Sequence, residues 1–222
     1  MLRYAIVRPP ASSFAQGLTE AGLGPPDLER ALAQHSAYCD ALAHCGLDLT
    51  RLEPDAAHPD STFVEDTALL TPRGTIVARP GAQTRRAESA GIRPVLERLR
   101  GAVRAIQAPG TLDAGDVCET ERHYFIGVSH RTNEEGARQL AAFLEEDGYR
   151  STAVDIRHVK GLLHLKSGLA YLGEGRLLAV ESLAERPELR GHRVVRVEPG
   201  EEYVANCVLV NGHLVLDGFF VV

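Results

Sequence analysis

Four stretches of the chain share one pattern, in which two apolar runs flank a short turn of polar residues or glycine. They cover residues 64–80, 114–132, 164–181 and 205–222. Paired apolar runs of strand length around such a turn predict β-hairpins. Asp66, Asp116 and Lys166 lie at equivalent points of the first three, in steps of 50 residues from 66 to 116 and from 116 to 166. A regular period of this size indicates a fold made of repeated structural units.

A helix and a further strand follow each of the first hairpins. After the second, Thr132 or Asn133 can cap a helix that Gly148 ends, and a strand follows at 151–156. The same pattern predicts helices over 26–45, 88–99 and, interrupted by Pro187, 184–189, with strands over 4–7, 47–52, 103–107 and 194–199. The repeated unit is therefore strand, strand, helix, strand, and the fold class is α/β.

The fourth unit stops after its hairpin, at Val222, without a helix or a closing strand. A domain that ended there would expose an apolar face and an unpaired sheet edge, which native proteins avoid. We therefore expect residues 1–222 to form a single α/β domain whose last unit is incomplete, and the natural protein to continue beyond Val222.

Composition and charge limit the expected partners. The chain has 24 basic and 30 acidic residues and no basic cluster with interleaved aromatic residues, which argues against nucleic acid and favours a small cationic ligand. No apolar run approaches the roughly 20 residues of a membrane span. No secretory signal begins the chain, so we expect a cytoplasmic protein that does not bind membranes. The cysteines have neither metal-site nor disulfide-framework spacing and are expected to be reduced, mostly buried thiols: Cys39, Cys45, Cys118 and Cys207.

Acidic residues gather where two of the hairpins begin. Asp60, Glu65 and Asp66 stand at the first, and Asp113 and Asp116 at the second. Equivalent strand ends of a radially repeated fold converge on one axis, so a bent backbone at these points would bring the carboxylates together. Paired carboxylates suit a planar guanidinium, which has five N–H donors. Taken separately, these residues also fit solvated loop acids and turn caps.

His164 stands at the equivalent point of the third hairpin. This alignment makes it a candidate acid–base, although an isolated histidine in an apolar run is more often structural. Arg85 and Arg86 follow the first hairpin, and Arg131 precedes a helix. These arginines fit either surface charge or paired hydrogen bonds to a carboxylate. Together the acids and the arginines match the two ends of an arginine-like amino acid.

Seven segments, in order along the chain, resemble the dimethylarginine dimethylaminohydrolase family, in the guanidine-modifying superfamily that includes arginine deiminase. They are GLT, FVEDTALL, ARPGAQTRR, APGTLDAGD, GVSHRTNEEGARQ, LHLKSGLAYL and VANCVLVN. The resemblance implies a five-bladed α/β propeller, the pentein fold, of ββαβ repeats around a pseudo-fivefold axis, with the last blade incomplete in this chain. It implies a hydrolase without metal or other cofactor, which converts Nω-methylated arginine to citrulline and a methylamine through a covalent cysteine thiouronium intermediate.

The resemblance also implies roles for particular residues. The family's substrate-binding positions fall on Leu18, Asp60, Glu65, Asp66, Arg85 and Arg131, and its catalytic acid and histidine fall on Asp113 and His164. Its nucleophile is a cysteine near the C-terminus, in a segment resembling GGxxCxSL that this chain lacks. Cys207 instead matches an interior strand without a catalytic role. We therefore expect the chain as given to be inactive.

Two other functions remain open. An arginine deiminase, or another hydrolase of a guanidinium or ureido compound, would release ammonia in place of an alkylamine, although this chain is short and has no inserted helical domain. A non-catalytic pentein used for binding, like translation initiation factor six, would need no nucleophile. Such a scaffold would not require acids, arginines and a histidine at matching positions. The sequence does not decide the oligomeric state, and a homodimer remains open.

Overall fold

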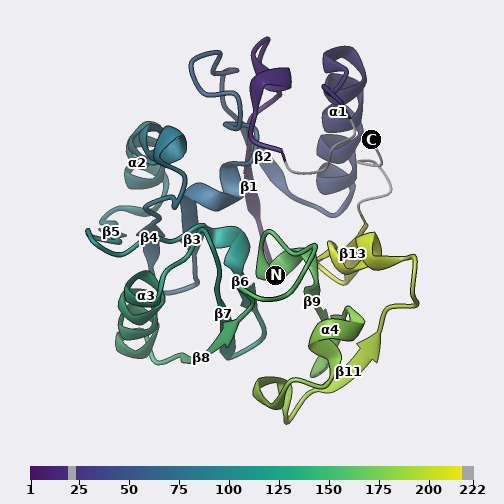
Figure 1. The fold of residues 1–222 in the computed structure, drawn as a ribbon. Helices are drawn as coiled ribbons and strands as arrows, with labels where there is room; N and C mark the ends of the chain where they lie inside the picture. The colour runs from purple at the N-terminus through teal and green to yellow at the C-terminus, as the bar shows by residue number, and fades with distance from the viewer. Residues whose placement is uncertain (20–23, 217–222) are drawn as a thin grey trace. The chain divides into compact units, whose positions relative to one another are not determined.

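The computed structural model describes residues 1–19 and 24–216, in two compact units (Figure 1). The larger unit comprises residues 65–208, and the smaller one comprises residues 1–64 together with the chain from residue 209 onward. The described residues form five small β-sheets of two or three strands each, with helices between their strands. The fold class is therefore α/β, as the hydrophobic pattern predicts.

The larger unit contains three successive ββαβ repeats, which confirms the repeated unit. In each repeat the first two strands are antiparallel and the third is parallel to the second. The first repeat comprises β3 (Ala68–Leu70), β4 (Thr75–Val77), α2 (Arg86–Arg100) and β5 (Arg104–Ala105). The second comprises β6 (Val117–Glu119), β7 (His123–Val128), α3 (Glu134–Glu146) and β8 (Arg150–Asp155). The third comprises β9 (Leu169–Gly173), β10 (Arg176–Ala179), α4 (Glu181–Ala184) and β11 (Arg193–Arg196).

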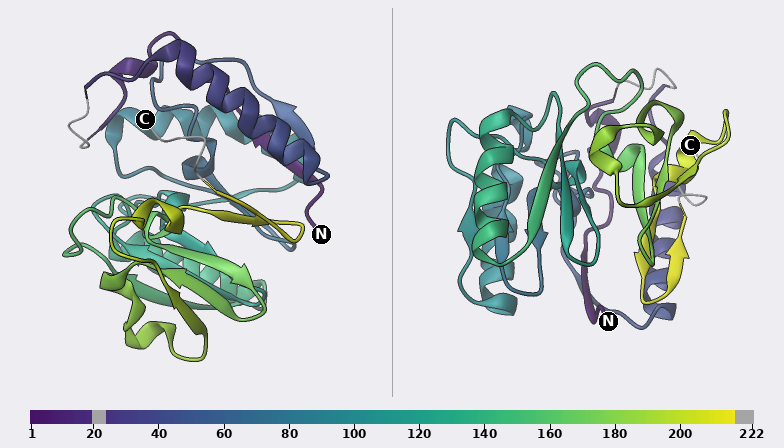
Figure 2. Two further views of the ribbon diagram at one scale, coloured as in Figure 1. Left: turned by 90° about the vertical axis from the view of Figure 1, so that its right-hand side faces the viewer. Right: turned by 90° about the horizontal axis from the view of Figure 1, so that it is seen from below.

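Local sequence explains the different helix lengths. Asn133 caps α3 by accepting a hydrogen bond from the Gly136 N–H at 2.8 Å. The helix lies along its sheet (Figure 2), and its buried residues Leu140 and Leu144 belong to the apolar cluster there. In the third repeat α4 has only four residues and is followed by the 3₁₀ turn η6 (Pro187–Leu189), because Pro187 lacks the backbone N–H that would extend the helix.

A 3₁₀ turn precedes each hairpin of the larger unit: η2 (Val64–Thr67), η4 (Ala114–Asp116) and η5 (Leu165–Ser167). These turns join successive repeats. Asp66 Oδ1 accepts a hydrogen bond from the Gly115 N–H at 3.0 Å, and Asp116 Oδ1 accepts one from the Leu165 N–H at 3.0 Å. The two bonds are equivalent, because each joins residues 49 positions apart. An aspartate at one hairpin thus holds the backbone of the next.

In the smaller unit, β1 (Tyr4–Val7) pairs in parallel with β2 (Asp48–Arg51), and α1 (Leu28–His44) connects them. The fourth hairpin is formed by β12 (Val208–Val210) and β13 (His213–Val215), and its predicted extension over residues 217–222 lies outside the described residues. Its two-residue turn has Asn211 at φ 49° and Gly212 at φ 87°, the left-handed conformations that an Asn-Gly hairpin turn requires. Among the described residues, no helix has the length and apolar character needed to cross a membrane.

Candidate active site

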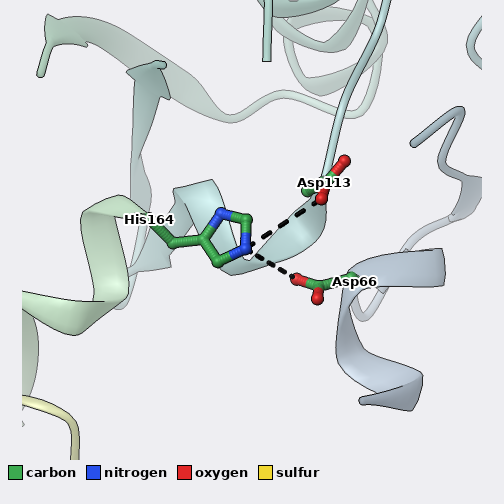
Figure 3. A group of neighbouring side chains, drawn as sticks. All are labelled: Asp66, Asp113 and His164. Atoms are coloured by element: carbon green, nitrogen blue, oxygen red, sulfur yellow. Dashed lines mark ion pairs between the residues drawn. The ribbon is translucent and has the colours of Figure 1, made fainter. Parts of the chain in front are cut away.

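Asp66, Asp113 and His164 converge from the starts of the three hairpins of the larger unit (Figure 3). His164 Nε2 lies 3.8 Å from Asp66 Oδ1 and 4.0 Å from Asp113 Oδ2. The 3₁₀ turns supply the bent backbone that the sequence interpretation required, because a straight strand would point neighbouring side chains to opposite faces. Two carboxylate oxygens and one imidazole nitrogen lie within 4.8 Å of one another, a donor set that could hold a divalent cation as well as an organic cation.

Asp116 lies on the other side of the histidine ring. Its Oδ2 is 3.5 Å from His164 Nδ1 and accepts hydrogen bonds from the Ser129 and Thr132 hydroxyls at 2.7 Å each. The side chains of Asp116 and Thr132 are fully buried. The carboxylate is therefore fixed, and its charge favours a ring orientation that turns Nε2 toward Asp66 and Asp113. The repeat predicts Asp116 at the position of Asp66 and among the converging carboxylates, but not its contact with His164.

Arg85 and Glu88 hold Asp66 from its opposite side. Arg85 Nη1 donates to Asp66 Oδ2 at 2.6 Å, and its Nε and Nη2 donate to Glu88 at 2.8–3.2 Å. All three side chains are buried. Asp66 is thus held through Oδ2 by Arg85 and through Oδ1 by the next repeat. The sequence did not single out Glu88 as a site residue, because its contact with Arg85 depends on the burial of this face of α2.

Asp113 has one satisfied oxygen and one that faces the site. Oδ1 accepts the Gly81 N–H at 2.8 Å, whereas the buried Oδ2 has no hydrogen-bond partner among the described residues. Burial, and next the charge of Asp66, raise the pKa of Asp113 to about 6. Carboxylates without a donor are costly in the interior, so this oxygen is suited to a ligand that brings an N–H.

Burial lowers the pKa of His164, but Asp116, Asp66 and Asp113 outweigh it, and the pKa is raised above the ordinary histidine value. The imidazolium is therefore favoured near neutral pH, and it can donate a proton from Nε2 on the side of the two other carboxylates.

Gly115 makes the close approach of these groups sterically feasible. A Cβ atom at this position would lie 2.6 Å from Asp66 Oδ1 and 3.1 Å from the His164 ring. Gly115, the second glycine of the segment GTLDAGD, is thus required by packing at the site, because any side chain there would push Asp66 and His164 apart.

Comparison with known proteins gives consistent results. Residues 26–200 match the model of the arginine deiminase family. The dimethylarginine dimethylaminohydrolase of Pseudomonas aeruginosa is 44% identical over 217 residues, which are 97% of this chain and 84% of that protein. This chain belongs to the dimethylarginine dimethylaminohydrolase family. The Streptomyces coelicolor member of the family is 37% identical over 96% of this chain and 81% of its own length.

Solved structures of the dimethylarginine dimethylaminohydrolase family have the same fold. A cysteine-to-serine variant of the P. aeruginosa enzyme, complexed with citrulline, superposes with a TM-score of 0.93 over 97% of this chain and 84% of that one, at 44% identity. The N-terminal domain of a cyanobacterial arginine dihydrolase superposes with a TM-score of 0.82 over 94% of this chain and 81% of that one. At 16% identity the latter likeness concerns the fold alone.

Two more predicted ligand positions of the dimethylarginine dimethylaminohydrolase family lie in the larger unit, and their roles stay predictions. Glu65 is exposed and forms an ion pair with Lys166, which stands in the third hairpin at the repeat position of Asp66. Arg131 is half-buried, and its guanidinium has no ion pair with any described residue. A ligand carboxylate at Arg85 would have to share or displace the contacts to Asp66 and Glu88.

The remaining predicted positions of the family, Leu18 and Asp60, lie in the smaller unit. The exposed Leu18 donates its backbone N–H to Asp60 Oδ1 at 3.0 Å, and Asp60 is buried. A Cβ atom at Gly17 would lie 2.6 Å from the same oxygen, so this GLT segment requires glycine for that contact. The two residues are brought together, as the family resemblance implies, and their contact with a ligand stays a prediction.

The cysteines of the larger unit are core residues. Cys118 and Cys207 belong to the apolar cluster of the third repeat. Burial raises the pKa of Cys118 to about 12 and raises that of Cys207. Protonated thiols of this kind are poor nucleophiles. In the smaller unit Cys39 is fully buried on α1, and Cys45 follows the end of that helix. The predicted assignment of these thiols to the core fits the burial of three of the four.

Asp113→Asn is expected to stabilise the fold at pH 8 and to leave it unchanged at pH 4. The pKa of Asp113 is higher in the folded protein, at about 6, than the unfolded value of 3.8. The stability from this acid is therefore complete below pH 4 and is lost as the pH rises through 6, by at most about 3 kcal/mol. Asparagine carries no charge and avoids that loss. Urea unfolding of both proteins at the two pH values measures the difference, and a gain that is independent of pH would contradict the assignment.

Proposed function

We propose that this protein hydrolyses Nω-methylated arginine to citrulline and a methylamine. The observation that carries the proposal is the convergence of Asp66 Oδ1 and Asp113 Oδ2 on the Nε2 side of His164. This arrangement places two acceptors for a guanidinium beside a group that can move a proton. Membership of the dimethylarginine dimethylaminohydrolase family supports the same reaction.

In this proposal the substrate cation replaces water between the two carboxylates. Asp66 and the ionised Asp113 accept hydrogen bonds from its unmethylated N–H groups, and their charge polarises the guanidinium carbon. Because Asp113 has a pKa of about 6, binding of the cation below that pH displaces one proton. Arg131 binds the substrate carboxylate. We propose that three further residues complete the site: Leu18, Asp60 and Glu65. Arg85 is proposed to contribute in one of two ways: it holds Asp66 in place, or it also binds the carboxylate of the ligand.

The proposed reaction is covalent. A cysteine thiolate attacks the guanidinium carbon, and the carbon–nitrogen bond to the methylated amine breaks as His164 protonates that nitrogen. His164, now neutral, takes a proton from water as the hydroxide adds to the thiouronium carbon. The thiolate then leaves, the new C–OH group gives up its proton to the released amine in solution, and citrulline is formed. Asp116 stabilises the imidazolium whenever His164 is protonated. The solved complex of a relative with citrulline, in a cysteine-to-serine variant, supports a cysteine and this product.

The nucleophile is proposed to come from outside the 222 residues. Cys118 and Cys207 are buried core thiols, whereas the relatives are longer than the matched region, which covers 84% of the P. aeruginosa protein. We further propose that the repeats belong to a single five-bladed α/β propeller domain, and that the protein acts in the cytoplasm. A homodimer remains a prediction.

Product analysis tests the proposed function. The protein as its gene encodes it is incubated with asymmetric dimethylarginine and, separately, with arginine, and citrulline, dimethylamine and ammonia are measured. Citrulline with dimethylamine is expected. Ammonia from arginine would favour the arginine deiminase reaction, which the matching family model keeps in view. Binding without any product would favour a binding module.

The 222-residue chain alone is the matched control. It is expected to bind arginine-like ligands weakly at best and to produce no citrulline, because it supplies no activated thiol. Turnover by this chain at an ordinary enzymatic rate, abolished by Cys207→Ser, would show that the nucleophile lies within it.

A further inference from the structure

Glu88 is a buried acid that the proposed reaction does not use. It lies in the first turn of α2 and is 7% exposed. Its two carboxylate oxygens accept hydrogen bonds from Arg85 Nε and Nη2, at distances of 2.8–3.2 Å. A buried carboxylate requires a charged partner, and Arg85 is that partner. The question is what this pair does beside the site.

The effect of this pair on the site depends on the charges of a cluster of three residues, Asp66, Arg85 and Glu88. Arg85 carries one positive charge, which its guanidinium keeps at any physiological pH, and it also donates to Asp66 at 2.6 Å. If Arg85 had Asp66 as its only counterion, the two charges would cancel. Glu88 is a second counterion of Arg85, through a 2.8 Å ion pair, so the single charge of Arg85 is shared between two carboxylates. These three groups carry one net negative charge, and Asp66 Oδ1 is the oxygen among them that lies 3.8 Å from His164 Nε2.

We propose that Glu88 is a positioning residue that acts through Arg85 to keep the charge of Asp66 available to a cationic ligand. The inference rests on the proposed function, since it concerns the selection of a guanidinium over an uncharged analogue of the same shape. Glu88 contributes no ligand contact. It determines how strongly the site prefers a cation.

Citrulline and asymmetric dimethylarginine separate these effects. Both have the same α-carboxylate and α-amine, so any contact of Arg85 or Arg131 with the carboxylate contributes equally to both. Only dimethylarginine carries the positive charge. The ratio of the citrulline inhibition constant to the KM of dimethylarginine therefore reports on the negative charge that Asp66 and Asp113 present to the ligand, and a change in it caused by Glu88 acts through Arg85 on Asp66. The measurements use the protein as its gene encodes it.

Glu88→Gln keeps the side-chain shape but removes the charge of Glu88, so Arg85 neutralises more of the charge of Asp66. We expect this ratio to fall by roughly 10-fold or more, the order expected when a charged acceptor is lost. Glu88→Asp should keep most of the ratio. Glu97→Gln is the matched control, because Glu97 also lies on α2 and pairs with an arginine, Arg93, at 2.9 Å, but on the exposed face. It should not change the ratio.

The double variant Arg85→Gln/Glu88→Gln gives the sharpest test. It removes both charges, so Asp66 is again unbalanced and the ratio should return toward the wild-type value. The double variant also avoids an unbalanced buried arginine, which keeps the test available if Glu88→Gln alone does not fold. A ratio unchanged in Glu88→Gln, or one that stays low in the double variant, would overturn the role of Glu88. A wild-type protein that binds neither ligand would instead overturn the proposed function.

Discussion

His164→Gln is expected to reduce kcat for dimethylarginine by about 10²- to 10⁴-fold, the usual contribution of a positioned acid–base. The raised pKa of His164 keeps the ring protonated near neutral pH, so it can protonate the departing amine. Glutamine has polar atoms of similar reach but cannot exchange a proton in this range. Without the proton the methylamine would leave as an anion, which is a far poorer leaving group. Steady-state assays of citrulline formation measure the effect.

Two controls separate catalysis from folding. His158→Gln changes an exposed histidine a few residues earlier in the same loop and should leave kcat unchanged. Circular dichroism should show that the His164→Gln protein is folded. If this variant unfolds or keeps its rate, His164 is a structural residue.

Asp66→Asn is expected to weaken binding of the guanidinium by about 1.5–3 kcal/mol, because it removes a charged hydrogen-bond acceptor. A second effect follows from the position of this carboxylate. Asp66 is one of the groups that raise the pKa of His164, so the variant should lose activity at a lower pH on the alkaline side than the wild type. Calorimetry with a dimethylarginine analogue and the pH profile of kcat measure the two effects separately.

Asp155→Asn is the matched control for this substitution. Asp155 is an aspartate of the larger unit, with a side chain 42% exposed, that pairs with Arg157 at 2.6 Å. Its replacement should alter neither affinity nor the pH profile. Unchanged affinity of the Asp66→Asn protein for the guanidinium would remove Asp66 from the binding site.

The regular elements could be predicted because their signals are local. Apolar runs around polar turns gave the hairpins, and Asn133 and Gly148 bounded α3. The convergence of Asp66, Asp113 and His164 could be expected because each stands where one of the repeated hairpins begins. What this reasoning required, a bend where each hairpin begins, is supplied by η2, η4 and η5.

The partners of the charged residues could not be predicted from sequence. Arg85 and Glu88 are three residues apart, which places them on one helical face but does not reveal that both are buried beside Asp66. The pair of Glu65 and Lys166 joins residues 101 positions apart. Such pairings depend on the packing of one repeat against another, and a pattern read within one repeat contains no information about them.

The hydrogen bonds from Asp66 to Gly115 and from Asp116 to Leu165 also bear on how the protein assembles. Asp66, which is proposed to bind the ligand, and Asp116, which lies beside the histidine, are the same groups that tie successive repeats together. A chain in which only one repeat has folded would therefore lack the catalytic constellation as well as the tertiary contact. The amide hydrogens of Gly115 and Leu165 become protected from exchange with solvent only when neighbouring repeats dock. Hydrogen exchange at these two amides therefore reports when the site forms during folding.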